Sequence, residues 1–226
     1  MIKEVVLSLL FLFNFNALIA QEYTSLEQAL QNPLQVKSLN LSNKGLTYLS
    51  EDIGKLKNLE RLNLSGNRLS QLPKSLFTLK KLNYLNITSN QISSLNGIGN
   101  LSNLLTLEAG FNRISALPKE IGSLKKLKKL NLSKNSLAIL PIEFCNLQAL
   151  EILDISYNQL TTVHESICAL SSLKTLDLSY NKRLNQFHMC IKLLKGLRIL
   201  NLKNTSLNNA QIDQLTWLIP DCQIVL

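Results

Sequence analysis

Residues 127–149 read LKKLNLSKNSLAILPIEFCNLQA, and closely similar lines stand before and after them. Residues 59–81 read LERLNLSGNRLSQLPKSLFTLKK, and residues 150–172 read LEILDISYNQLTTVHESICALSS. Leucines, one asparagine and often a Leu-Pro pair therefore return every 23 residues. A fixed period of this length predicts a chain built from stacked copies of one short unit.

Each copy begins with apolar and polar residues in alternation. In the copy that starts at Leu127, the apolar Leu130 and Leu132 flank the polar Asn131, as in a strand with one buried face. The same apolar pair recurs as Leu62/Leu64, Leu85/Ile87, Leu107/Ala109, Leu153/Ile155, Leu176/Leu178 and Leu200/Leu202. One copy alone has no core, so the strands must stack in parallel to bury these faces.

An asparagine follows each strand at a fixed place, as Asn67, Asn90, Asn112, Asn135, Asn158 and Asn181. The chain must turn inward there, and its buried amide and carbonyl groups need partners that no sheet supplies at a corner. A side-chain amide both donates and accepts, so we expect a column that joins the turns of adjacent repeats. We give this column a structural role and no part in ligand binding. Lys44 and Thr205 stand at its place in the first and last repeats.

The second half of each unit returns the chain to the next strand. Leu137, Leu140, Phe144 and Leu147 supply its apolar residues, and Pro141 fixes the backbone where this leg starts. Their spacing predicts short helical turns rather than long helices. With the line LxxLxLxxNxL and its continuation LPxxIxxLxxL, the chain resembles the 23-residue subtype of leucine-rich repeat proteins from about Val36 to its end.

The resemblance implies an α/β fold. It is a leucine-rich repeat solenoid, a curved right-handed superhelix with a parallel β-sheet on its concave face and short helical or irregular segments on its convex face. Eight repeats are expected over residues 36–221. Thr24 and Glu27 have capping-box spacing, so residues 21–35 should hold an N-terminal capping helix. A helix at about 210–218 and a capping strand at 222–226 should close the other end.

Residues 1–20 differ from the rest in composition. Lys3 is followed by an apolar stretch that ends at the small Ala20, which indicates a secretory signal peptide. The uninterrupted apolar run is too short to span a membrane. We therefore expect an exported protein, secreted, periplasmic or at the cell surface, with no transmembrane segment in the mature chain, and similar to exported bacterial members of the family.

The net charge of +9 first suggests a nucleic acid or an acidic surface as partner. Its distribution argues otherwise, because Lys80, Lys81, Lys125, Lys126 and Lys128 fall where one repeat meets the next, at solvated places. No nucleic-acid motif accompanies them. We expect no nucleic-acid partner and keep contact with an anionic glycan or envelope surface as an alternative.

Cysteines and histidines each have a structural and a functional interpretation. Cys145 and Cys168 share one repeat position, which permits a disulfide in an exported protein, although free cysteines also serve as small apolar residues there. We expect Cys190 and Cys222 to be free. His164 and His188 replace the usual proline and invite a zinc hypothesis, but their spacing matches no zinc module, so we interpret them as solvated side chains.

No catalytic motif is assembled in the sequence, so we expect no enzyme, no cofactor and no metal. What remains is the concave face, formed by the third, fifth and eighth residues of each repeat. The resemblance implies that this face binds a protein of unknown identity; the alternative is a glycan or envelope-surface protein that uses its basic lateral patches. The candidate contact residues are Tyr84, Glu108, Phe111, Ile152, Asp154, Tyr157, Asp177 and Tyr180.

Overall fold

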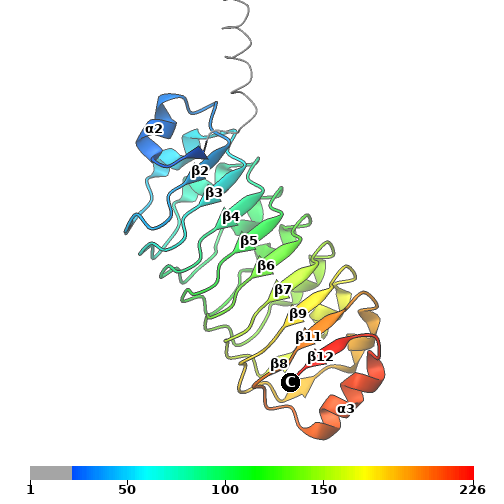
Figure 1. Ribbon diagram of the computed structural model, residues 1–226. Coiled ribbons are helices and arrows are strands. Elements are labelled where there is room, and N and C mark those ends of the chain that lie inside the picture. The colour runs from blue at the N-terminus through cyan, green and yellow to red at the C-terminus, as the bar shows by residue number, and fades with distance from the viewer. Residues whose placement is uncertain (1–21) are drawn as a thin grey trace, which may run out of the picture.

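A single row of short parallel strands runs along the whole molecule (Figure 1). The computed structural model describes residues 22–226, and the predicted signal peptide lies outside this part of the chain. The row is a ten-stranded sheet of order β1-β2-β3-β4-β5-β6-β7-β9-β11-β12. Its strands are β1 (Glu22–Tyr23), β2 (Ser38–Asn40), β3 (Arg61–Asn63), β4 (Tyr84–Asn86), β5 (Thr106–Glu108), β6 (Lys129–Asn131), β7 (Ile152–Asp154), β9 (Thr175–Asp177), β11 (Ile199–Asn201) and β12 (Gln223–Val225).

The strands pair so that each repeat's leucine lies beside the equivalent leucine of its neighbours. Leu130, for example, is in register with Leu107 on one side and Leu153 on the other. All three are fully buried in one apolar core that continues along the whole stack. Because each repeat buries its leucines only against adjacent repeats, the stack is held together by nearest-neighbour contacts. The predicted solenoid is confirmed.

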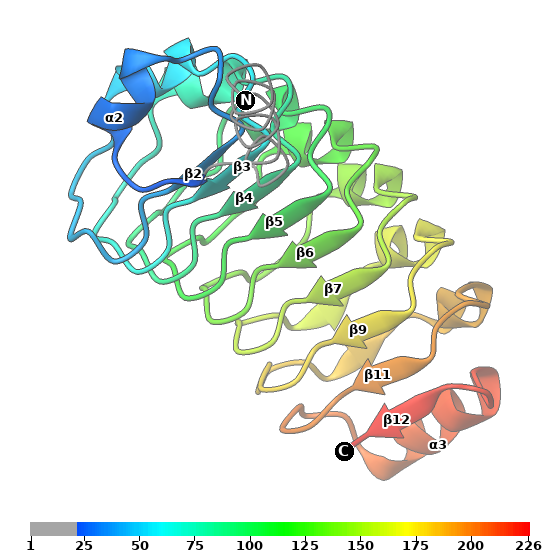
Figure 2. The ribbon, with the colours of Figure 1, turned by 45° about the horizontal axis from the view of Figure 1, so that its top comes forward.

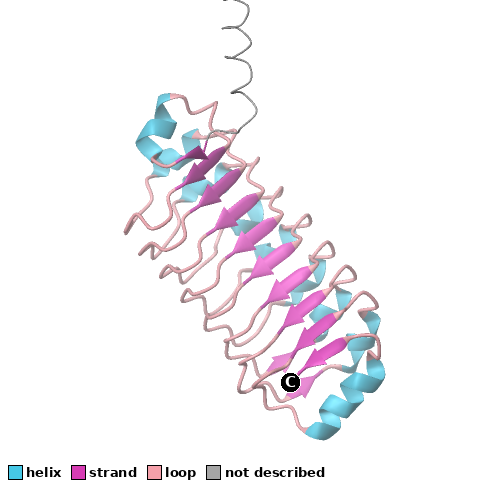
Figure 3. Cartoon of the chain, in the orientation of Figure 1, coloured by secondary structure: helices cyan, strands magenta, loops and turns pink. Residues whose placement is uncertain are grey.

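Short 3-10 helices form the opposite face, as Figures 2 and 3 show. Pro73, Pro118 and Pro141 precede three of them with φ near −70°, the value to which the pyrrolidine ring restricts the backbone. The helices span η2 (Glu51–Lys55), η3 (Lys74–Thr78), η4 (Ile98–Asn100), η5 (Lys119–Ser123), η6 (Ile142–Asn146), η7 (Glu165–Ala169) and η8 (Met189–Leu193).

The asparagine column forms the predicted hydrogen-bonded ladder. Nδ2 of Asn135 donates to the carbonyl of Ala109 in the preceding repeat and to that of Leu132 in its own, both at 3.0 Å. Its Oδ1 accepts from the Ile114 amide at 2.9 Å. The other ladder asparagines make equivalent bonds. In the last repeat the Thr205 hydroxyl replaces part of the ladder by donating to the Leu202 carbonyl at 2.8 Å.

The two ends of the stack are covered by extra elements. Helix α2 (Leu26–Gln31) begins after Ser25, whose hydroxyl accepts from the Gln28 amide, so the predicted capping box at Thr24 and Glu27 is one residue out of place. Strand β1, which the sequence analysis missed, pairs with β2 beside this helix. At the other end lie α3 (Asn209–Leu218), with a capping box between Asn208 and Gln211, and then β12.

Repeats 6 and 7, which start at Leu150 and Leu173, carry additional links. A second, two-stranded parallel sheet joins β8 (Thr162–Val163) to β10 (Gln186–Phe187). His164 and His188 follow these strands and cap η7 and η8, because Nδ1 of each ring accepts the amide hydrogen two residues on, at 3.1 and 3.2 Å. Both histidines are exposed, as predicted, and each ring also replaces the proline by forming a cap.

The disulfide is not the one that the shared repeat position of Cys145 and Cys168 permitted. It joins Cys168 to Cys190 with the Cα atoms 5.7 Å apart, whereas Cys145 and Cys222 carry free thiols. The prediction that Cys190 is free is therefore wrong, because Cys168 is bonded to Cys190 and not to Cys145.

The physical reason is an offset between adjacent 3-10 helices. The fourth residue of one helix faces the second residue of the next. A Cβ built on Gly54 would lie 2.6 Å from Cβ of Ser75, and one on Gly122 would lie 3.0 Å from Cβ of Glu143. Cys168 is fourth in η7 and Cys190 is second in η8, so this pair meets directly. Residues at the same position, as Cys145 and Cys168 are, do not.

We predict that Asn135→Ala lowers the free energy of unfolding by about 1–3 kcal/mol, because it leaves the Ile114 amide without a partner and removes one of the two donors to each of the Ala109 and Leu132 carbonyls. Asn135→Asp should be at least as destabilising, since a carboxylate cannot donate to the two carbonyls. Urea and thermal unfolding followed by circular dichroism measure both changes.

The matched control is Lys44→Ala, which changes the same repeat position at the open end of the stack, where the Lys44 side chain is exposed. It should leave the unfolding midpoint nearly unchanged. Equal stabilities of the wild type and Asn135→Ala would contradict the assigned role of the ladder.

Candidate partner-binding face

The concave face presents three rows of side chains, which are the third, fifth and eighth residues of each repeat when its first apolar residue is number one. The third and fifth residues lie on the strands, and the eighth lies just before the ladder asparagine. Every candidate contact residue is in one of these rows. The third row holds Tyr84 and Ile152, the fifth Glu108, Asp154 and Asp177, and the eighth Phe111, Tyr157 and Tyr180.

The eighth residue of each repeat has a left-handed backbone. Its φ is 55° at Phe111, 52° at Lys134 and Tyr157, and 57° at Tyr180. Non-glycine residues adopt this conformation at a cost, so it persists only where its surroundings fix it. Here the amide of the eighth residue donates to the carbonyl of the seventh residue in the next repeat, as from Tyr157 to Ser179 at 2.8 Å. Equal backbones in equal register place these side chains in one column.

The column ends in a tight aromatic stack. The rings of Tyr157 and Tyr180 lie 4.0 Å apart between centroids and are tilted by only 7°. Tyr157 is nevertheless 42% exposed. On its other side, Nζ of Lys134 lies 4.9 Å from the Tyr157 ring and 4.2 Å from the Phe111 ring. Phe111, Lys134, Tyr157 and Tyr180 therefore form one continuous stacked column across four repeats, which we call the aromatic column.

The Tyr180 hydroxyl affects the ionisation of Tyr157. The pKa of Tyr157 is raised above its ordinary value of 10.0, chiefly by hydrogen bonding to Tyr180, and further by desolvation and by the charges of Tyr180 and Asp177. The Tyr157 phenol is thus neutral at physiological pH. The pair offers a flat apolar surface with polar tips, which is typical of residues that dominate protein interfaces.

The acidic residues of the fifth row differ in how freely they can bind a partner. Asp177 is fully engaged, since Oδ1 accepts from Ser179 and Oδ2 accepts from Asn201 Nδ2 at 2.9 Å. Asp154 accepts only from the Ser156 amide, through Oδ1. Glu108 is paired with Lys129 at 2.7 Å, and this bond raises the pKa of the lysine. Asp154 is therefore the most available of the three carboxylates.

Two features of this face were missed by the sequence analysis. Ile199 is 39% exposed in the third row, two strands from Ile152, which is 40% exposed. Lys134 completes the aromatic column. Both occupy the row positions that identify the other candidates, so their positions alone were sufficient to find them. Tyr84 lies apart, on β4, under the guanidinium of Arg61 at 4.3 Å.

The lysines between repeats lie on a lateral edge and are partly engaged. Nζ of Lys81 donates to Asn58 and Nζ of Lys126 donates to Asn103, both at 2.7 Å. Lys174 and Lys128 both pair with Glu151, and hydrogen bonding to Lys174 is the main reason that the pKa of Glu151 is lowered. Part of the basic charge is therefore used within the protein.

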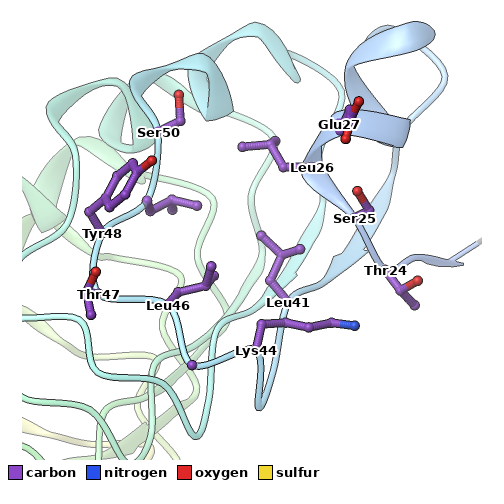
Figure 4. A pocket seen from close by; sticks show the side chains of 12 residues that line it. Thr24, Ser25, Leu26, Glu27, Leu41, Lys44, Leu46, Thr47, Tyr48 and Ser50 are labelled. Carbon is purple, nitrogen blue, oxygen red and sulfur yellow. The ribbon is translucent and has the colours of Figure 1, made fainter.

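A hollow of about 700 Å³ opens at the N-terminal end, between α2 and the first repeat (Figure 4). Leu26 projects into it from the helix, opposite Leu41 and Leu46, while Lys44 and Tyr48 lie at its margin. It exists because the first repeat has no preceding repeat to cover its apolar residues. Its lining carries no cluster of titratable groups, and we assign it no function.

Residues 22–226 lack two other kinds of feature. This part contains no group of three or more His, Cys, Asp or Glu side chains that could hold a metal ion. Nor does it contain a helix long and apolar enough to cross a bilayer.

Comparison with known proteins gives consistent results. A family model described as a leucine-rich repeat region matches residues 6–112 and 89–218. Among solved structures, the chain is similar to a leucine-rich repeat protein of Leptospira interrogans, with 35% identity, a TM-score of 0.75, and 91% of this chain and 58% of that chain covered. The chain thus spans little more than half the length of that protein. No curated protein matches the chain.

Two other solved structures share the fold. An internalin of Listeria monocytogenes is 22% identical, with a TM-score of 0.76, and the similarity covers 89% of this chain and 57% of that one. A plant peptide hormone receptor, RGFR1 in complex with RGF2, is 26% identical, with a TM-score of 0.74, covering 90% of this chain and 34% of the receptor chain.

We predict that Tyr180→Phe lowers the pKa of Tyr157 toward 10.0, because the substitution removes the hydroxyl that is the main cause of its raised value while keeping the ring stack. Ultraviolet difference titration near the phenolate band measures the change. Tyr84→Phe, at a distant tyrosine of the same face, is the control and should leave the pKa of Tyr157 unchanged. A Tyr157 pKa that is the same in Tyr180→Phe as in the wild type would contradict this role of the Tyr180 hydroxyl.

Proposed function

The chain belongs to the leucine-rich repeat family, and from this membership we propose that it is a non-enzymatic protein that binds another protein through the concave face of its solenoid. The binding centre that we propose is the Tyr157–Tyr180 end of the aromatic column, in repeats 6 and 7, with Ile152, Ile199 and Asp154 beside it. A protein partner suits this surface better than a small molecule, because the surface is an open strip of side chains across several repeats rather than an enclosed pocket.

The observation that carries the proposal is the exposed stack of Tyr157 on Tyr180. Two rings held in parallel by left-handed backbones lose little side-chain freedom when a partner covers them. The two side chains are already ordered in the folded protein, so binding loses little of their conformational entropy. Burial of their remaining exposed surface therefore contributes directly to affinity. Tyrosine is also among the residues that most often dominate interface energetics.

The neighbouring side chains indicate what a partner should present. Ile152 and Ile199 offer two separate apolar contacts, with Thr175 between them on β9. The free carboxylate oxygen of Asp154 adds one negative charge. A complementary protein segment therefore carries apolar side chains and at least one basic residue. In support, the similar plant receptor RGFR1 forms a complex with RGF2.

Export is a second part of the proposal. The predicted signal peptide and the Cys168–Cys190 disulfide both support it, because disulfides persist in oxidising compartments outside the cytoplasm. An exported binding protein would meet its partner outside the cell or in the envelope.

The binding test replaces both stacked rings. Tyr157→Ala with Tyr180→Ala should weaken binding more than about tenfold, or roughly 1.4 kcal/mol, because it removes the central apolar surface. The partner is first recovered by cross-linking from native extracts with the mature chain as bait, and its affinity is then measured by calorimetry. The variant should remain folded, because neither ring belongs to the buried core.

Tyr48→Ala is the matched control, since Tyr48 is 76% exposed but lies outside the concave face. It should bind as the wild type does. Reversal of Lys125, Lys126 and Lys128 to Glu should also have little effect on a protein partner. Binding that survives loss of the tyrosines, collapses on lysine reversal and weakens steeply with salt would instead indicate an anionic surface.

We predict that the mature chain begins near Gln21. Mass spectrometry of protein from its native host should find cleavage close to Ala20, as the composition of the leader indicates. Recovery of an intact Met1 from the cytoplasm would overturn the proposed export without affecting the proposed binding face.

A further inference from the structure

Three cysteines lie in a row on the convex side of repeats 5, 6 and 7. Cys145 is on η6, Cys168 on η7 and Cys190 on η8, and all three line one shallow, mostly apolar hollow of about 380 Å³. Cys168 and Cys190 are bonded, whereas the half-buried Cys145 carries a free thiol. A free thiol beside a disulfide is the arrangement that thiol–disulfide exchange requires.

We propose that these cysteines form an exchange site in which the Cys145 thiolate displaces Cys190 from Cys168. The stacking order of the repeats carries the inference. Because η7 lies between η6 and η8, Cys145 lies on the side of η7 opposite Cys190, and all three cysteines line the same hollow.

The exchange needs no external oxidant. The Cys145 thiol loses its proton, and its sulfur forms a bond to Cys168 Sγ while the Cys168–Cys190 bond breaks. The electron pair of the broken bond stays on Cys190, which takes up a proton. One disulfide and one thiol are present before and after the step, so the cross-link moves from repeats 6 and 7 to repeats 5 and 6.

The offset between convex helices explains why the observed bond is the resting form. Cys190 stands directly opposite Cys168, whereas the residue directly opposite Cys145 is Ser166. The Ser166 hydroxyl is buried and has no hydrogen-bond partner, and it lines the same hollow. Cys168 lies two residues after Ser166 on η7, so the Cys145 side chain must turn past Ser166 to reach it. The shifted bond is therefore the less populated one.

A bond between Cys145 and Cys190 is excluded by distance. Two repeat steps separate them, or about 9.6 Å at the strand spacing. A disulfide needs Cα atoms within about 7 Å. Cys168 is thus the only one of the three that can bond to either of the others.

The test measures which cysteine can be labelled when no reductant is present. All proteins carry Cys222→Ser, which removes the remaining free thiol among the described residues. The oxidised protein is incubated with N-ethylmaleimide at a concentration low enough for exchange to compete, and labelled peptides are identified by mass spectrometry over time. Cys190 should become labelled with Cys145 present and stay unlabelled in Cys145→Ser. Equal absence of label on Cys190 in both proteins overturns the proposal.

Two further variants test whether the shifted bond can form at all. After oxidation with oxidised glutathione, Cys190→Ser should contain a Cys145–Cys168 bond, whereas Cys168→Ser should keep both remaining cysteines as thiols or glutathione adducts. Circular dichroism checks that each variant is folded. If Cys190→Ser leaves Cys145 and Cys168 unbonded while Cys145→Ser forms the Cys168–Cys190 bond, the exchange site does not exist.

Discussion

The turn after each strand imposes the constraint on which the rest of the structure depends. It buries backbone groups that no neighbouring strand can reach, and the ladder asparagine supplies their partners. Since each asparagine bonds to its own repeat and to the preceding one, all turns must keep one register. That register requires a left-handed residue just before the asparagine. The exposed aromatic column follows from the same requirement, because it occupies this left-handed position in four successive repeats.

The parts of the structure that could be predicted are those encoded at a fixed spacing. Leu130 and its equivalents indicated the sheet, Asn135 and its equivalents indicated the ladder, and the third, fifth and eighth positions indicated the concave rows. Each of these depends on contacts between identical positions of adjacent repeats. The adjacency of Tyr157 and Tyr180 follows in the same way. Their parallel geometry does not, because it depends on the backbone conformation at both residues.

The features that were not predicted depend on contacts between different positions. Cys168 meets Cys190 because adjacent convex helices are offset by two residues, and no count of spacings reveals that offset. Asp177 has the same place in its repeat as Asp154, yet Asn201 of the next repeat binds its second oxygen. The two carboxylates look alike in sequence and differ in the structure. Small departures from the repeat therefore decide which concave residues are free to bind.

Repeats 6 and 7 are joined at several points around their circumference. The tyrosine stack links them at the concave rim, the β8–β10 pair links them on the return leg, and the disulfide links them on the convex side. In mechanical terms, the joint between repeats 6 and 7 is cross-linked on both the concave and the convex side of the curved stack. When the stack is bent or pulled, this joint should open less readily than the joints between other described repeats, which carry no disulfide. If a partner binds at this joint, a force on the stack would deform the other repeats first, and the surface that contacts the partner would keep its shape.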